Sequence, residues 1–125
     1  MTAPPSPARE RLPDTRPSLT NKRVICGYEC YVTVGFYENG DRLRPGEVFV
    51  KIAKQGSMVA GLVDGAMVMV SLLLQHGVPW STIRAKFEHG RFGNEAGDLD
   101  HSSLYDGIAK AIDHLIAQRH SIIGD

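Results

Sequence analysis

The 125-residue sequence has little of what would mark a specialised class of protein. Its two cysteines, Cys26 and Cys30, are too few for the disulfide framework of a small secreted domain. Its 14 lysines and arginines balance its 14 aspartates and glutamates, so no excess charge favours nucleic acid or an anionic membrane. The composition, 42% hydrophobic and 22% charged, is ordinary for one soluble globular domain.

No apolar leader stands near the N-terminus, where residues 1–17 contain five prolines and several charges, so we expect a cytoplasmic protein. The arginines and lysines between residues 9 and 23 are interpreted as a solvated basic arm rather than a nucleic-acid site. Residues 58–74 are strongly apolar but include Asp64, two glycines and Ser71. Because a membrane span needs about 20 apolar residues, we interpret this stretch as a buried core helix.

The chain divides into a short tail and one domain. Residues 1–10 are rich in proline and polar residues and are predicted to be disordered, and residues 11–125 are predicted to form a single domain. Pro13 and Pro17 favour extended backbone over residues 11–20. We therefore expect an extended arm there that lies against the domain.

Three segments carry the alternation of a β-strand: residues 22–26, 29–37 and 47 to about 53. Between the second and third, Asn39-Gly40 tolerates positive φ and predicts a turn, so these two strands are expected to pair antiparallel. In the third strand, the side chains of Val48, Val50 and Ile52 are predicted to share one face.

Three helices are predicted after the strands. Ser57 is the expected N-cap of a helix over residues 58–75, which is apolar on nearly all sides and is predicted to be the central core helix. A short helix is expected through residue 87 and a last helix from residue 103 to about 120. The predicted fold class is α+β, with a small antiparallel sheet of about three strands packed on a long apolar helix and two further helices.

The two cysteines are separated by three residues. On an extended strand they would lie about 13 Å apart, at roughly 3.3 Å per residue, so a bridge would require a tight turn at Gly27-Tyr28. We interpret Cys26 and Cys30 as buried structural thiols, with a redox pair as the less favoured alternative.

No catalytic residue and no metal site are predicted. The five histidines do not pair with acids or cysteines at the spacing of metal ligands, and the Gly-x-Ser-x-Gly run of many hydrolases is missing.

The segment that joins the third strand to the long helix is the candidate binding site. Lys51, Lys54, Gly56 and Ser57 place two lysines beside a helix N-terminus, a combination that can hold a phosphate or carboxylate. The spacing is not that of a P-loop. Simple helix capping with two solvated lysines is the alternative interpretation.

Asp64 is unusual because it is a carboxylate in an apolar helix. If it is buried it needs a partner, and Arg91 or Arg84 is expected to supply one as a structural ion pair.

Several ordered motifs resemble the C-terminal accessory (TSCPD-like) domain of adenosylcobalamin-dependent, class II ribonucleotide reductases, here as a stand-alone chain. The resemblance covers residues 11 to about 92. It is carried by RLPDTRPSLT (11–20), GYECYVTVGFYENG (27–40), GEVFVKIAKQGS (46–57), Gly61-Leu62 with Asp64, LLLQHGVPW (72–80), Lys86-Phe87 and Arg91-Phe92.

The departures from that family shape the expected function. The sequence shows no large (β/α) barrel, no Thr-Ser-Cys-Pro-Asp run and no cysteine-rich tail. The resemblance therefore implies an accessory or regulatory module of deoxyribonucleotide synthesis that is not catalytically complete alone. Adenosylcobalamin is implied by family association only, with no cofactor bound by this chain itself.

The resemblance implies a separately encoded ribonucleotide reductase catalytic chain as the partner, or self-association. The alternative is an independent small protein that binds an anion or nucleotide at residues 54–57. A thiol oxidoreductase that uses Cys26 and Cys30 is the least favoured of the three hypotheses.

Overall fold

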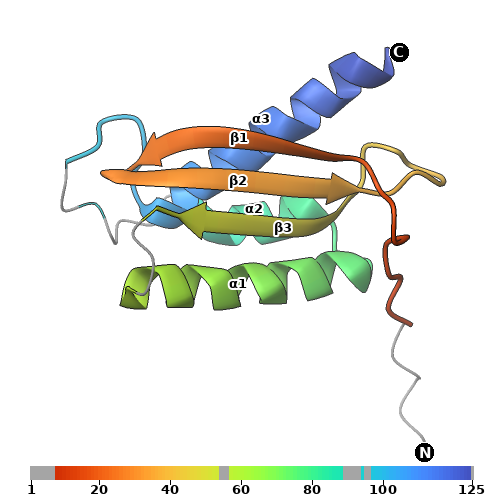
Figure 1. Cartoon of the computed structure of the whole chain (residues 1–125), viewed down its shortest axis with the longest axis horizontal. Coiled ribbons are helices and arrows are strands. Elements are labelled where there is room, and N and C mark those ends of the chain that lie inside the picture. The colour runs from red at the N-terminus through yellow and green to blue at the C-terminus, as the bar shows by residue number, and fades with distance from the viewer. Residues whose placement is uncertain (1–7, 54–56, 89–93, 95–96, 125) are drawn as a thin grey trace, which may run out of the picture.

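The computed structural model describes residues 8–53, 57–88, 94 and 97–124. Three antiparallel strands form one sheet in the order β1-β2-β3, and three helices follow them in the chain (Figure 1). The predicted α+β class is confirmed. The elements are β1 (Ser18–Ile25), β2 (Tyr28–Phe36), β3 (Pro45–Ile52), α1 (Met58–Gln75), α2 (Trp80–Phe87) and α3 (Leu104–Ile123).

Strands β1 and β2 form a hairpin with a two-residue loop. Ile25 pairs with Tyr28, and the loop residues Cys26 and Gly27 have φ angles of 51° and 85°. Positive φ at both positions is what a type I′ hairpin turn requires. Strand β1 begins at Ser18, four residues before the predicted start at residue 22. The early start was not predicted because the first residues of the strand are mostly polar and do not show the alternation that marks a strand.

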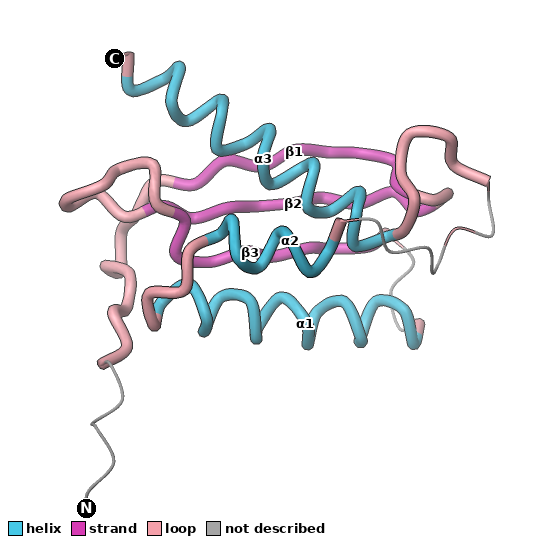
Figure 2. The backbone as a smooth tube through the Cα atoms, turned by 180° about the vertical axis from the view of Figure 1, so that it is seen from behind, coloured by secondary structure: helices cyan, strands magenta, loops and turns pink. Residues whose placement is uncertain are grey.

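The two faces of the sheet differ. The side chains of Val32, Val34 and Phe36 are buried on one face, together with the predicted group Val48, Val50 and Ile52. Helices α2 and α3 lie on that covered face, which Figure 2 shows from behind, whereas Figure 1 shows the open face. The shared face predicted for the third strand is confirmed.

Helix α3 is the main core helix, and the expectation that residues 58–75 would fill this place is wrong. Nine residues of α3 are buried, including Ile108, Ile112 and Leu115, whereas only five of the eighteen residues of α1 are buried. By length and a mean hydropathy of 1.8, α1 is apolar enough to cross a membrane, but hydropathy alone does not say what covers a helix. In this fold one side of α1 packs against β3 and the opposite side is exposed.

Helix α1 covers the free edge of the sheet. The hydroxyl of Ser71 accepts a hydrogen bond from the Val48 N–H at 2.9 Å and lies 3.3 Å from the Val48 carbonyl, to which it donates. The side-chain amide of Gln75 donates to the Gly46 carbonyl at 2.8 Å. These bonds satisfy main-chain groups of β3 that would otherwise be open to pairing with another strand.

The arm that leads to β1 is fastened to the domain. The Glu10 N–H donates to the Gln75 carbonyl at 2.8 Å, and the Arg9 guanidinium donates to the Gln75 side chain. Arg16 forms a two-pronged ion pair with Glu47, with both N–O distances at 2.7 Å. The predicted boundary after residue 10 falls inside this anchored segment, and residues 1–7 lie outside the described part of the chain.

Candidate functional site

The candidate site from the sequence lies at a groove between β3 and the first half of α1. Lys51 and Ser57 both line this groove of about 510 Å³, so the fold brings together two of the four predicted residues. Lys54 and Gly56 lie outside the described residues. The remaining lining residues are Phe49, Val50, Ile52, Ala60, Gly61 and Asp64.

Ser57 is the N-cap of α1, as predicted. Its backbone is extended, with φ −83° and ψ 157°, and its hydroxyl accepts from the Ala60 N–H at 3.1 Å. This bond satisfies one of the donors at the helix start. The remaining N–H groups of the first turn, with the ammonium of Lys51 nearby, are the features that would attract an anion.

Asp64 is not the buried carboxylate that the apolar sequence around it indicated. It is exposed on α1 and lines the groove with Lys51. Arg84, one of its two expected partners, instead pairs with Asp113 at 2.5 Å and Glu88 at 2.6 Å. The other expected partner, Arg91, lies outside the described residues. A carboxylate at this position opposes binding of an anion, so the groove is mixed in charge.

The two cysteines are buried in and beside the hairpin turn. Cys26 is 2% exposed and Cys30 is 0% exposed, and neither forms a disulfide. Burial, with a smaller contribution from the neighbouring Cys26, raises the pKa of the Cys30 thiol to about 11. A thiol with this pKa is protonated at neutral pH and is a poor nucleophile, as is typical of structural cysteines.

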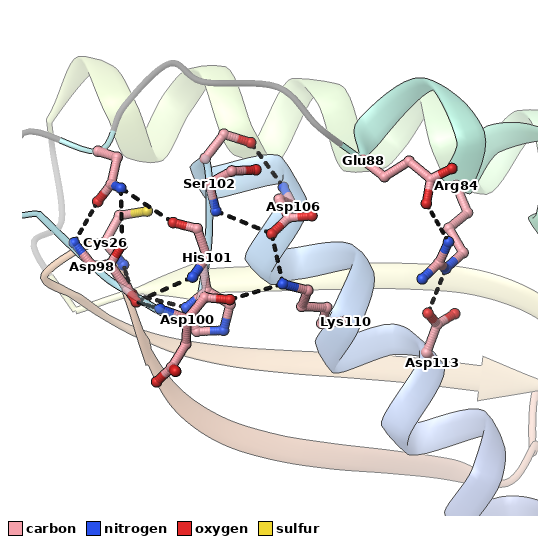
Figure 3. A network of polar contacts seen from close by, with 12 residues as sticks. Cys26, Arg84, Glu88, Asp98, Asp100, His101, Ser102, Asp106, Lys110 and Asp113 are labelled. Carbon is pink, nitrogen blue, oxygen red and sulfur yellow. Dashed lines mark hydrogen bonds and ion pairs between the residues drawn. The ribbon is translucent and has the colours of Figure 1, made fainter.

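A second polar cluster, which the sequence analysis did not identify, joins the hairpin turn to the start of α3 (Figure 3). The Asp98 carboxylate accepts from the Cys26 N–H at 2.8 Å, from the Asp100 N–H at 2.8 Å and from the His101 ring at 2.8 Å. These donors, the His101 ring first, hold the pKa of Asp98 well below its ordinary value. Asn94 extends the cluster by accepting from the Asp98 N–H at 2.7 Å.

The start of α3 continues this polar cluster. Ser103 caps the helix by accepting from the Asp106 N–H at 3.0 Å, and the Asp106 carboxylate accepts from the Ser102 N–H at 3.1 Å. Lys110 pairs with Asp106 at 2.9 Å and donates to the Asp100 carbonyl at 2.7 Å. Hydrogen bonding and the Lys110 charge outweigh burial and lower the pKa of Asp106.

These polar residues are held by one another rather than aimed at a common point. Within the described ranges, no group of three or more histidine, cysteine, aspartate or glutamate side chains is arranged to hold a metal ion. The carboxylates of Asp98 and Asp106 both have protein donors, so the cluster locks the hairpin turn to α3. Local signals for it exist in the sequence, namely Asp98 three residues before His101 and the capping pair Ser103 and Asp106.

A family model described as the TSCPD domain matches residues 3–116. The chain belongs to the TSCPD domain family. The match runs through the loop and into α3, whereas the sequence motifs reached only about residue 92. No solved structure matches this TSCPD domain significantly.

The similar curated proteins are much longer than this TSCPD domain. A vitamin B12-dependent ribonucleotide reductase of Rhodopirellula baltica is 45% identical over 113 residues, covering 90% of this chain and 10% of that protein. One from Streptomyces clavuligerus is 40% identical, covering 94% of this chain and 13% of that protein. The same enzyme from Streptantibioticus cattleyicolor is also 40% identical, and 20% of it is covered.

The run Thr-Ser-Cys-Pro-Asp does not occur in this sequence. Ser103 and Asp106 have the spacing of the serine and aspartate in Thr-Ser-Cys-Pro-Asp, but Leu104 and Tyr105 stand between them. The two residues that agree are those that cap α3, and the cysteine and proline are missing.

Proposed function

We propose that this TSCPD domain is an accessory module of a B12-dependent ribonucleotide reductase, and that it acts by binding the catalytic chain of that enzyme. The observation that supports this most directly is the match to proteins of that name over only 10–20% of their lengths. In those proteins the domain is covalently joined to a much larger remainder, which supports contact with the rest of the reductase as the role of the domain.

We assign ribonucleotide reduction and adenosylcobalamin to the catalytic chain. Cys30 is buried and its pKa is about 11, so this thiol is unsuited to redox chemistry at neutral pH. Two buried, unbridged cysteines accord with a reducing, cytoplasmic location.

The test is a reductase assay with the purified catalytic chain, adenosylcobalamin and a dithiol reductant. This TSCPD domain alone is expected to give no deoxyribonucleotide, and its addition to the catalytic chain is expected to form a complex and change turnover. Product from the domain alone would contradict the proposal. So would the lack of any complex and any effect on turnover.

A second candidate function, binding of a small phosphorylated ligand, is favoured by the meeting of Lys51 and Ser57 at one groove. A ligand that binds only the folded protein raises its melting temperature. We expect millimolar nucleotide or inorganic phosphate to raise it, Lys51→Ala to remove the shift, and Asp64→Asn to enlarge it by removing a repulsive charge. If no shift occurs with the unmodified protein, Ser57 serves only as a helix cap.

A further inference from the structure

The outward side of α1 is the most apolar exposed surface of the described residues. Six of the eleven exposed large hydrophobic side chains lie on this one helix. Met58, Leu62, Met69 and Leu72 follow spacings of four, seven and three residues, and therefore line up along one stripe. The six are Met58, Leu62, Val68, Met69, Leu72 and Leu73.

An apolar groove between α1 and α2 continues this stripe. It measures about 430 Å³, and Met69 and Leu73 belong both to the stripe and to the groove. Phe87 and Tyr105 stack at the groove with ring centroids 4.7 Å apart. We call the six side chains and this groove the docking face. The other groove residues are Ala66, Val70, Val78, Thr82, Ile83 and Lys86.

The docking face is mostly apolar, as is typical of a surface that is covered by a partner. A helix that is apolar on all sides is normally buried on all sides, because exposed apolar area is unfavourable in water. Asp64 is the single charged residue of α1. Large contiguous apolar patches on a soluble domain mark sites of interaction.

The route of the arm indicates which polypeptide lies nearest to this face. Arg9 and Glu10 are bound to Gln75 in the last turn of α1, so the first described residues of the arm lie beside that helix (Figure 1). In the Rhodopirellula baltica reductase 90% of the protein lies outside the matched segment. That remainder is joined to the matched segment in a single chain, so it is the large polypeptide available to cover the docking face.

We propose that the docking face binds the catalytic chain of the reductase through an apolar surface of that chain, with a lysine or arginine at the margin of this surface near Asp64, which lies on the β3 side of α1. This inference rests on the proposed function and adds to it the surface that is used. Pairing of α1 with α1 of a second copy fits less well, because each α1 would bring its Asp64 carboxylate and no cation, and the one lysine of the docking face, Lys86, lies on α2.

The test compares two pairs of variants in which equally exposed side chains are made polar. Leu62 and Met69 on the docking face are 65% and 68% exposed, and Val24 and Ile122 elsewhere are each 63% exposed. We expect Leu62→Gln and Met69→Gln each to weaken binding to the catalytic chain about 10-fold, as is common for central interface residues. Val24→Thr and Ile122→Gln should bind as the unmodified protein does. Melting curves of the free variants serve as the control that all four remain folded.

The outcomes separate the surface from the function. If the unmodified protein binds the catalytic chain and Leu62→Gln with Met69→Gln does not weaken binding, the docking face is wrong and the accessory role stands. If the unmodified protein does not bind at all, the proposed function fails and this inference fails with it. A dimer in light scattering that these two substitutions dissociate would assign the face to a second copy and overturn the occupant proposed here.

Discussion

Asp98 is the residue on which most main-chain and side-chain donors of the polar cluster converge. Its carboxylate joins Cys26 in the hairpin turn to residues 100 and 101 before α3, across 72 positions of sequence. The donors favour the ionised form, and this is the physical cause of its lowered pKa. The negative charge therefore stabilises the folded state at neutral pH.

This gives a prediction for the pH dependence of stability. Because the pKa of Asp98 is lower in the folded than in the unfolded chain, its contribution is fully present above the ordinary value of 3.8 and is lost as the pH falls below it. Urea unfolding should show Asp98→Asn to be less stable than the unmodified protein from about pH 7 down to about pH 4, and the difference should shrink at lower pH. A difference that persists undiminished at still lower pH would contradict this role.

At the scale of elements, Gly107 sets the distance between α3 and β1. A Cβ atom at this position would lie 2.1 Å from the Cγ2 of Ile25, so the helix can approach the strand only because the side chain is missing. Gly65, on the exposed side of α1, would place a Cβ with nothing within 4 Å. An added side chain is therefore excluded at Gly107 and tolerated at Gly65, although both glycines stand inside helices.

Alanine substitutions separate these two situations. Alanine is favoured over glycine inside a helix by about 1 kcal/mol, so Gly65→Ala should raise the free energy of unfolding by roughly 0.5–1 kcal/mol. Gly107→Ala should lower it by about 1–3 kcal/mol, because the overlap with Ile25 outweighs helix propensity. Urea denaturation measures both. Equal effects of the two substitutions would show that α3 can move away from β1 at little cost.

The elements that were predictable from sequence are those whose signals are local. The bounds of α1 follow from the cap at Ser57 and the stop at Gly77, and the structure confirms them. What lies on each side of an element was harder to predict. Glu47 is adjacent to Val48 in β3 and its side chain therefore points to the face opposite the core, yet Arg16 from the arm binds it and it is only 7% exposed. The contact of Asp98 with Cys26 gives no local pattern and was missed.

At the scale of the whole molecule, the chain is a three-stranded sheet that is covered by helices on one face only, with the apolar helix α1 along its β3 edge. The sheet and α3 enclose the core, and α1 closes the β3 edge through Ser71 and Gln75 while presenting its other side to the surroundings. A helix placed in this way can transmit contact with a partner to the edge strand of the sheet. The groove with Lys51 lies between this helix and β3.

The arm holds these parts together, and its removal is the prediction at this scale. Arg16 pairs with the buried Glu47, and a Cβ at Gly46 would lie 2.9 Å from the Leu12 side chain, so the arm packs directly on β3. Deletion of residues 1–17 would leave the Glu47 carboxylate without its cation and remove the contacts of Glu10 with α1.

We expect this deletion to lower the free energy of unfolding by about 2–4 kcal/mol, which for a domain near this size lowers the melting temperature by several degrees or more. Deletion of residues 1–7 is the matched control, since it keeps every contact described for the arm. In the protein that lacks residues 1–17, hydrogen exchange should become faster in β3 and in the last turn of α1, the two segments that the arm contacts. The change in α3 should be much smaller. If both deletions melt at the same temperature, the arm rests on the domain without stabilising it, and the ion pair of Arg16 with Glu47 does no more than offset the loss of hydration of its charges.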